Sequence, residues 1–591
     1  MNGAMSGMIV WMNLKRISLC LETGSLSWKE GLTVQNLFTY EGETLTGQPW
    51  KDYPRPQMVR KEWLCLNGDW EFEHCGSRTS IRVPYCPESL LSGYHGEIRY
   101  GKDMLYRRTF SIPQTWHGKH VLLHFGAVSR HAEIFLNQAL ICSHDNGYLP
   151  FTVDVTEHLL PEKNELILRV VNDLSPRYPW GKQKKKRGGM WYTPVSGIWQ
   201  TVWAEPVPEQ YIRKITVHTE DDRAELYLDG VQEGTVAFGT DTITVHDGHA
   251  SISIADPVFW SPEQPHLYPI TITAGEDIVR SYFALRTLDI RRIGDRNRLC
   301  LNGRPYFFHG LLDQGYWSDG LYTPPTPEGY ASDILSMKAL GFNTLRKHIK
   351  VEPERFYYDC DRLGMIVFQD MVNCGVYHYI RDTVLPTIGL QKRKDSRLNR
   401  DPDTRKHFLS AMEETAEHLH NHPCICLYTV FNEGWGQFQA DHAYHMLKKL
   451  EPGRFVNATS GWFHQQESDV FSLHIYFDRL HLGESDRPQL LSEFGGYSYK
   501  LPAHSFNLNK TYGYRKYQTR EEFVDALRKV YIDEVLPLIP DGLCGAVYTQ
   551  VSDVEDETNG ILTYDRRVKK IEAEEFQDVS RKLCAALAVQ P

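Results

Sequence analysis

The sequence lacks the features that would indicate a membrane, a nucleic acid or a disulfide scaffold. No run of apolar residues approaches the roughly 18 that span a bilayer. Basic residues are not in excess, since 65 Lys and Arg stand against 75 Asp and Glu, and at a net charge of −10 neither nucleic acid nor an anionic membrane is an expected partner. The 12 cysteines show neither paired spacing nor a zinc pattern, so free thiols in a reducing compartment are expected.

The N-terminus also lacks the order of a secretory signal. Its short apolar patch, residues 8–14, is followed rather than preceded by Lys15 and Arg16. Together with the cysteine pattern, this predicts a cytoplasmic protein.

What the sequence does contain is typical of a soluble multidomain protein. It has 591 residues, of which 41% are hydrophobic and 24% charged, and at about 150 residues per domain this predicts about four domains, or fewer if one is a large barrel. Aromatic residues reach 12%, with 14 Trp and 32 Tyr. Flat apolar rings suit sugar binding, although the cores of large β-sandwiches use them equally.

The first half of the chain has the pattern of β-sandwiches. Residues 1–45 show weak periodicity and are expected to be a loose extension. Across 46–206, short alternating or apolar runs such as 131–137 and 165–171 are separated by turn residues, which predicts a sandwich of many strands. Residues 207–292 repeat the pattern in a smaller unit of immunoglobulin-like size.

After residue 293 the pattern changes to apolar runs that alternate with helical spacing. Eight runs occur before the C-terminus, and eight β-α alternations in about 300 residues predict a (β/α)8 barrel over 293–591. Active sites of such barrels lie at the carboxyl ends of the strands. The polar residues that finish each run are therefore the candidates for chemistry.

Two of these runs end in a glutamate that glycine follows closely. The fourth finishes at Asn432, Glu433 and Gly434, and the seventh finishes at Glu493. Glycosidic cleavage needs two facing carboxyl groups, one protonated to donate to the leaving oxygen and one ionised to attack the sugar or activate water. Each Glu alone could instead cap a helix or pair with an Arg; the occurrence of both on separate barrel strands favours catalysis.

Several motifs, in this order, resemble glycoside hydrolase family 2, which contains β-galactosidases, β-glucuronidases, β-mannosidases and β-galacturonidases. The matching stretches span about residues 50–575 and are 66–72, 196–203, 340–346, 421–423, 431–434 and 492–495. The resemblance implies a jelly-roll sugar-binding domain, an immunoglobulin-like sandwich and a catalytic barrel. It also implies that Glu433 is the acid/base, that Glu493 is the nucleophile, and that a terminal β-linked sugar is hydrolysed with retention through a covalent glycosyl-enzyme.

Other strand ends supply a predicted substrate-binding set. Arg346 and Tyr476 are expected to donate to Glu493, and Asn432 is expected to donate to the sugar 2-hydroxyl. The full set is Asn432, Asp313, Arg346, Lys347, His348, Tyr476, Arg515, Gln550, Asp553 and Trp435.

The identity of the sugar stays open between a β-galactoside and a β-galacturonide. Where family glucuronidases have an Asn-x-Lys pair that resembles a carboxylate clamp, this chain has Glu557 and Asn559, which argues against a glucuronide because Glu would repel it. Lys347 and Arg515 are instead expected to meet a galacturonide carboxylate, since Arg and Lys bind carboxylates well. The alternatives are a β-glucuronidase and, from another class, an inactive carbohydrate-binding or scaffold homologue.

Two further clusters have simpler explanations. The histidines at 418, 420 and 422 do not converge on one ion at helical spacing, so no metal or cofactor is predicted. The basic run 182–187 is expected to be a solvated loop, which could border the mouth of the site together with Trp180, Trp191 and Tyr192. The expected partner is a small carbohydrate, and the resemblance implies that the chain can form a homo-oligomer, as family members commonly do.

Overall fold

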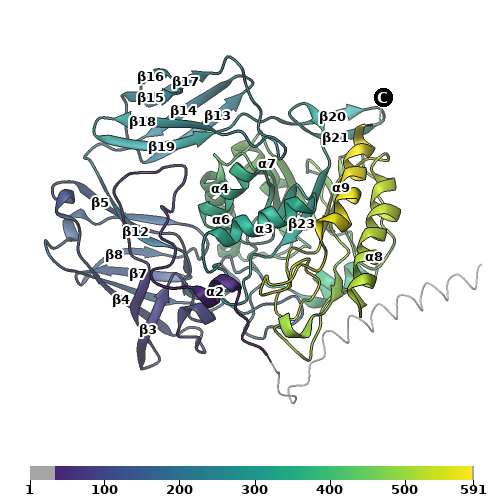
Figure 1. Cartoon of the computed structure of the whole chain (residues 1–591), viewed down its shortest axis with the longest axis horizontal. Helices are drawn as coiled ribbons and strands as arrows, with labels where there is room; N and C mark the ends of the chain where they lie inside the picture. Colours follow the sequence, from purple (N-terminus) through teal and green to yellow (C-terminus); the bar gives the residue numbers. More distant parts are fainter. Residues whose placement is uncertain (1–33, 589–591) are drawn as a thin grey trace, which may run out of the picture.

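A computed structural model describes residues 34–588. Two β-sandwiches lie beside a barrel that is surrounded by helices, and this confirms the predicted fold class (Figure 1). In Figure 1 the first sandwich lies at the lower left, the second at the upper left, and the barrel occupies the centre and right.

The first sandwich packs a six-stranded sheet, ordered β3-β2-β4-β10-β7-β8, against a four-stranded sheet, ordered β1-β12-β5-β9. Its strands are antiparallel, and alternate residues such as Trp70 and Phe72 of β2 are buried while Asp69 and Glu71 face solvent. The strands are β1 (Leu64–Cys65), β2 (Gly68–His74), β3 (Ser77–Val83), β4 (Asp103–Phe110), β5 (His120–Phe125), β7 (His131–Leu136), β8 (Ala139–His144), β9 (Phe151–Asp154), β10 (Asn164–Val171) and β12 (Val202–Val207).

The second sandwich packs a sheet ordered β13-β14-β17 against one ordered β16-β15-β18-β19. Its seven strands are antiparallel and enclose a core of their own, as expected for an immunoglobulin-like unit. They are β13 (Lys214–Glu220), β14 (Arg223–Asp229), β15 (Gly234–Phe238), β16 (Asp241–Val245), β17 (His249–Ser253), β18 (Tyr268–Ala274) and β19 (Asp277–Phe283).

The barrel consists of eight parallel strands, ordered β27-β26-β25-β24-β23-β32-β29-β28. At the seam between the two ends of this sheet, the Ser472 hydroxyl of β28 donates to the Thr459 carbonyl of β27 at 3.1 Å. The strands are β23 (Phe308–Asp313), β24 (Thr344–Lys347), β25 (Ile366–Asp370), β26 (Ile425–Asn432), β27 (Phe455–Ser460), β28 (Phe471–Ile475), β29 (Gln489–Phe494) and β32 (Leu543–Tyr548). Each overlaps one of the eight apolar runs of the sequence.

Helices surround these strands and begin at recognisable caps. The side chain of Asp401 accepts from the Thr404 amide at the start of α6, and Thr519 forms a capping box with Glu522 at the start of α8. The main helices are α3 (Glu328–Ala339), α4 (Glu354–Leu363), α6 (Pro402–Leu419), α7 (Ala440–Leu450), α8 (Arg520–Val530) and α9 (Ala573–Ala588). None of the helices in residues 34–588 is long and apolar enough to cross a membrane.

Residues 34–45 differ from the predicted loose extension, whose first 33 residues lie outside the described part of the chain. Val34 pairs with Asn507, and the short helix α2 (Tyr40–Thr44) follows Thr39, which donates from both its amide and its hydroxyl to Asp319 at 2.8 Å. The segment is therefore held against the loops of the barrel.

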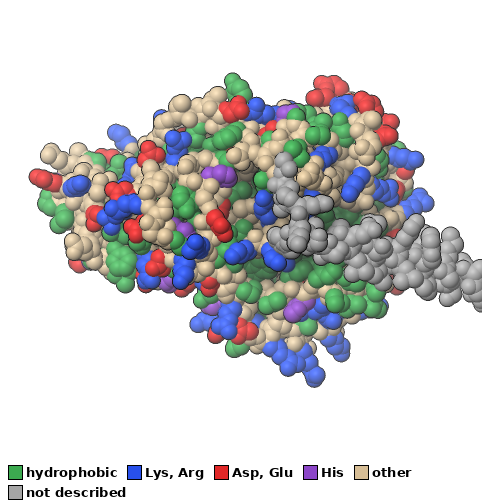
Figure 2. Space-filling view, turned by 90° about the horizontal axis from the view of Figure 1, so that it is seen from below, with side chains coloured by type: hydrophobic (Ala, Val, Ile, Leu, Met, Phe, Trp, Pro, Cys, Tyr) green, Lys and Arg blue, Asp and Glu red, His purple; other side chains and the backbone are tan. Residues whose placement is uncertain are grey.

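The face shown in Figure 2 carries Lys and Arg side chains interspersed with Asp and Glu. This mixture agrees with the small net charge of the sequence.

Candidate active site

The two predicted glutamates meet at the carboxyl ends of the barrel strands. Glu433 follows the last residue of β26 directly, and Glu493 is the penultimate residue of β29. Both are buried, with 9% and 4% of their surface exposed, and an oxygen of one carboxylate lies within 4.8 Å of an oxygen of the other. This spacing is close to the roughly 5–5.5 Å between the carboxyl groups of retaining glycosidases.

His474 connects the two carboxylates, a role that the sequence did not reveal. Its Nδ1 lies 2.8 Å from Oε1 of Glu433, and its Nε2 lies 3.5 Å from Oε1 of Glu493 and 2.8 Å from the Ser460 hydroxyl. Because side chains of a strand alternate, His474 of β28 faces the barrel interior together with Ser472, whereas Leu473 between them points outward.

Glu493 is held ionised by donors on its other side. Arg346 Nη1 donates to Oε1 of Glu493 at 2.9 Å, and the Tyr476 hydroxyl donates to Oε2. Burial alone would raise the pKa of Glu493, but the positive charges of His474 and Arg346 outweigh it and lower the pKa below its ordinary value of 4.5. A carboxylate that stays ionised at neutral pH is suited to nucleophilic attack.

Asn432 and Glu433 are fixed by the backbone as well as by side chains. Asn432 Oδ1 accepts from Arg346 Nη2 at 2.8 Å. The Nδ2 of Asn432 is buried and has no acceptor in residues 34–588. Glu433 adopts a φ of 51°, in the left-handed region that costs a non-glycine residue free energy. The Glu433 amide donates to the Ser460 carbonyl at 2.9 Å, and the Glu433 carbonyl accepts from Trp462 Nε1 at 3.0 Å.

The pocket around this pair draws side chains from two domains. It is lined by Lys182, Met190, Leu312, Gln314, Asn432, Glu433, Tyr476, Glu493, Tyr512, Tyr514, Thr549, Glu557 and Asn559. The cavity volume is about 20 Å³, which holds about one water molecule.

The predicted carboxylate clamp is wrong in its geometry. Arg346 points into the barrel, so the next residue of β24, Lys347, points toward the helices. Its ammonium lies 4.2 Å from the centre of the Phe356 ring of α4 and pairs with Asp313 at 2.6 Å and Glu352 at 2.8 Å.

Arg515 is also outside the pocket. It is exposed, and its guanidinium lies 5.3 Å from the centre of the Tyr497 ring. The structure therefore brings neither Lys347 nor Arg515 to the two glutamates.

Gln550 and Asp553, predicted near the sugar, lie behind the pocket wall. Gln550 Nε2 donates to Glu557 at 2.7 Å and to Asn559 at 2.9 Å, so it positions two residues that do line the pocket. Asp553 pairs with Lys570 at 2.6 Å and is 1% exposed.

Trp435 and His348 likewise support the site from outside the pocket lining. Trp435 stacks on Trp191 with ring centroids 5.3 Å apart. His348 Nδ1 lies 2.8 Å from Asp370, which also accepts from Arg346 Nε at 3.0 Å.

The basic loop 182–187 is only partly solvated, in contrast to the prediction. Lys182 is 9% exposed and lines the pocket, with its ammonium 5.6 Å from the centre of the Trp435 ring. No side chain in residues 34–588 hydrogen bonds to that ammonium, whereas Lys185 and Lys186 are exposed. Arg187 lies 3.6 Å from Glu555.

The histidines at the end of α6 do not converge on one site. His420 contacts Glu451 at 2.9 Å and His422 contacts Asp361 at 2.6 Å, so these two histidines have separate partners. Within the described residues, the only group of three or more His, Cys, Asp and Glu side chains close enough to share an ion is Glu433, His474 and Glu493. Each ring nitrogen of His474 faces a different carboxylate, an arrangement that favours a bridging imidazole over a metal ligand.

Family models match most of the chain. The model described as "Glycosyl hydrolases family 2, TIM barrel domain" matches residues 292–578, "Glycosyl hydrolase 2 galactose-binding domain-like" matches 87–228, and "Glycosyl hydrolases family 2" matches 209–286. The three follow one another along the chain as the two sandwiches and the barrel do.

Individual relatives are distant. A β-galactosidase of Thermoanaerobacter pseudethanolicus is 24% identical over 498 residues, covering 76% of this chain and 62% of that protein, and an Aeromonas hydrophila β-galactosidase is 25% identical with 46% of its length covered. The chain thus spans only about half to three fifths of these two relatives. A β-glucuronidase of Felis catus is 22% identical, covering 78% of this chain and 76% of that protein.

Solved structures share the fold at low identity. A β-D-glucuronidase of Dictyoglomus thermophilum superposes with a TM-score of 0.70 at 17% identity, covering 91% of this chain and 99% of the other. A β-galacturonidase from Eisenbergiella tayi bound to galacturonate gives 0.66 at 20% identity, covering 90% and 99%. On the matches of all three family models, the chain belongs to glycoside hydrolase family 2.

Proposed function

We propose that the protein is a retaining exo-β-glycosidase that removes a terminal galacto-configured sugar. The observation that carries this proposal is the approach of a Glu433 oxygen to within 4.8 Å of a Glu493 oxygen inside one buried pocket. Glu493 attacks the anomeric carbon while protonated Glu433 gives its proton to the departing oxygen. Deprotonated Glu433 then takes a proton from water, whose oxygen displaces Glu493 from the sugar.

The neighbouring side chains support these roles. Arg346 and Tyr476 stabilise the charge on Glu493, which has to be ionised to form the ester. The unpaired Nδ2 of Asn432 is available to the sugar 2-hydroxyl, where a hydrogen bond strengthens as positive charge develops on the ring. His474 contacts both carboxylates and can move proton density between them as their charges exchange.

Action on a terminal sugar is supported by the walls of the pocket. Met190 from the first sandwich and the paired rings of Tyr476 and Tyr514, stacked 3.8 Å apart, line the pocket together with the two glutamates. The similar proteins include β-galactosidases and a β-galacturonidase, which agree with a galacto configuration, and β-glucuronidases, which do not. The unpaired thiols of all eleven described cysteines support a reducing, cytoplasmic location.

Lys182 favours a galacturonide as a second candidate substrate. Its ammonium lies in the pocket without a hydrogen-bond partner in the described residues, and a sugar carboxylate could supply one. Glu557 argues against a galacturonide, because it competes with the sugar carboxylate for the same ammonium. Burial raises the pKa of Glu557, and the positive charge of Lys182 opposes that rise and so stabilises the ionised carboxylate. A neutral galactoside would instead place its hydroxyl groups against Glu557.

Hydrolysis of the 4-nitrophenyl β-galactoside, β-galacturonide and β-glucuronide tests both the glycosidase activity and the identity of the sugar. Lys182→Met should reduce activity on the galacturonide at least tenfold relative to the galactoside if the carboxylate meets Lys182, since about 1.4 kcal/mol corresponds to tenfold. Lys185→Met, in the same loop but exposed, is the matched control. A ratio that is equal in wild type and both variants would reject Lys182 as a uronate ligand.

Two further experiments test the covalent mechanism. Glu493→Ala should lose turnover, and a 2-deoxy-2-fluoro glycosyl fluoride should label Glu493 of the wild-type protein covalently. If the wild-type protein binds these sugars but neither hydrolyses them nor becomes labelled, it is an inactive carbohydrate-binding homologue instead.

A further inference from the structure

We propose that the N-terminal strap, residues 34–39, positions one wall of the catalytic pocket. The strap contacts the tyrosine loop, residues 500–514, whose Tyr512 and Tyr514 line the pocket. The strap itself lies outside the pocket lining. Its residues are therefore positioning residues, and the inference rests on the proposed function of that pocket.

The tyrosine loop has little regular structure of its own. It joins β30 (Tyr497–Tyr499) to β31 (Arg515–Tyr517), which pair in parallel, and its regular structure is one 3-10 turn at Pro502–His504. Parallel strands are usually joined by a helix, whose internal hydrogen bonds fix the connection. Irregular connections of this length are uncommon in compact domains. The conformation of the loop therefore depends on contacts from other segments.

Gln35 of the strap supplies three such contacts. Its amide donates to the Phe506 carbonyl at 2.8 Å. Its side-chain Nε2 donates to the Pro502 and Ser505 carbonyls, each at 2.8 Å. Because one residue binds three carbonyl groups of the loop, it restricts the backbone of residues 502–506.

The other end of the strap is fixed to the barrel. Thr39 donates to Asp319, which has no exposed surface, and the Phe38 carbonyl accepts from Arg567 Nε at 2.9 Å. Leu37 is buried and belongs to the apolar cluster between the first sandwich and the barrel. The strap is thus anchored independently of the tyrosine loop, as a positioning element has to be.

The tyrosine loop transmits this restraint to the pocket. Asn507 is 2% exposed and donates from Nδ2 to Asp556 Oδ1 at 2.7 Å, and the Asp556 carbonyl accepts from the Tyr512 amide at 2.7 Å. Tyr514 stacks on Tyr476, the tyrosine that donates to the nucleophile, with ring centroids 3.8 Å apart. A shift of residues 502–507 would therefore move the tyrosine wall relative to the two glutamates.

Steady-state kinetics of strap variants tests this role. Gln35→Glu keeps the size of the side chain but removes the N–H groups that reach the loop, and Thr39→Val removes the hydroxyl that donates to Asp319. Both should raise KM for a 4-nitrophenyl β-glycoside about threefold to tenfold with kcat within twofold of wild type, because the wall binds the sugar while the two glutamates keep their own contacts. Tyr40→Ala, directly after the strap and 69% exposed, is the matched control and should leave both constants unchanged.

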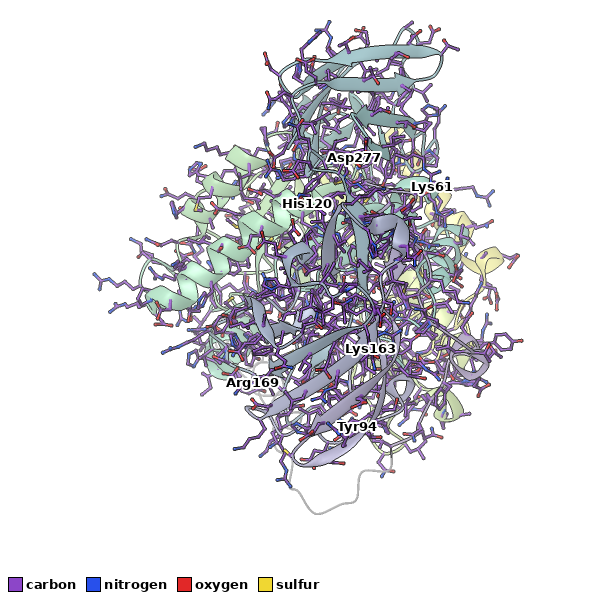
Figure 3. The ribbon with its side chains drawn as sticks, turned by 90° about the vertical axis from the view of Figure 1, so that its left-hand side faces the viewer. Lys61, Tyr94, His120, Lys163, Arg169 and Asp277 are labelled. Carbon is purple, nitrogen blue, oxygen red and sulfur yellow. The ribbon has the colours of Figure 1, made fainter. Side chains whose placement is uncertain are left out.

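Hydrogen–deuterium exchange follows the loop without turnover. Peptides covering residues 500–514 should exchange faster in both strap variants than in wild type. Peptides covering Lys163 to Arg169 of the first sandwich, both labelled in Figure 3, should exchange as in wild type.

Unchanged KM in both strap variants, with or without a lower melting temperature, would show that the strap only stabilises the fold and would overturn the proposal. Loop exchange equal to that of wild type would also overturn it. Absence of hydrolysis by wild-type protein would instead reject the proposed function, and the exchange rates would still test the strap.

Discussion

Replacing Arg346 by Gln is the most informative perturbation of the catalytic pair. The buried guanidinium, 1% exposed, donates to Glu493, Asp370 and Asn432 at 2.8–3.0 Å and so fixes the nucleophile relative to its neighbours. Glutamine is shorter and uncharged, and it cannot reach all three.

The expected magnitude follows from the lost contacts. Hydrogen bonds to charged groups contribute about 1.5–3 kcal/mol each, so the two bonds to Glu493 and Asp370 are worth about 3–6 kcal/mol together. Partial replacement by the new amide leaves an expected fall in kcat/KM of about 10²- to 10³-fold. The free energy of unfolding should also fall, because buried Asp370 loses the guanidinium that pairs with it at 3.0 Å.

The variant should also change the pH dependence. The pKa of Glu493 is lowered in the folded protein, and Arg346 is one cause, so its removal raises that pKa. Since the ionised form is the nucleophile, the acidic limb of kcat/KM should move to higher pH. Stability from ionised Glu493 is complete above its ordinary pKa of 4.5 and is lost as the pH falls through the lowered value. That acid-dependent loss of stability should shrink in the variant.

Arg298→Gln is the matched control. Arg298 is equally buried at 1% exposed but donates to the Ile539 and Pro540 carbonyls before β32, away from the carboxyl ends of the strands. It should lose stability without a shift in the pH profile. If folded Arg346→Gln keeps kcat/KM within threefold and its acidic limb does not move, the assignment of Arg346 as the residue that positions Glu493 is incorrect.

Three further substitutions test other parts of the account. His474→Gln should lower kcat by about 10- to 100-fold at neutral pH, because an amide cannot pass a proton between the two carboxylates; unchanged kcat would exclude the bridging role. Lys347→Met should reduce the free energy of unfolding in urea by about 3–5 kcal/mol, because Asp313 loses its cation and buried Glu352 keeps only Lys350, while the galacturonide-to-galactoside ratio stays constant. A changed ratio would restore Lys347 as a substrate ligand. Gly434→Ala should destabilise the protein and reduce activity, since its φ is 72° and a Cβ would lie 2.3 Å from the Phe463 ring; a normal melting temperature would show that the loop relaxes.

The barrel could be predicted from sequence because its strands are buried on both faces and appear as short apolar runs. The same logic identified Glu433 and Glu493, since a carboxylate that ends such a run must face the mouth of the barrel. Sequence gave no comparable indication for residues 34–45, whose position depends on contacts with Asp319 and Asn507 far along the chain.

The ligand-binding side chains were harder to predict because charge in a sequence does not reveal its partner. Lys347 follows Arg346 but points to the opposite face, where Glu352 neutralises it. Lys182 reaches the pocket from another domain, a contact that no local pattern encodes. His474 could have been found from the two-residue alternation that places it on the same face as Ser472.

The stereochemistry of the first product tests the central claim most directly. Proton NMR of early hydrolysis of a 4-nitrophenyl β-glycoside substrate distinguishes the anomers before they interconvert. Two carboxylates within 4.8 Å of each other predict that the β-anomer forms first, by double displacement. Initial release of the α-anomer would mean that water attacks directly, and would contradict a covalent intermediate on Glu493.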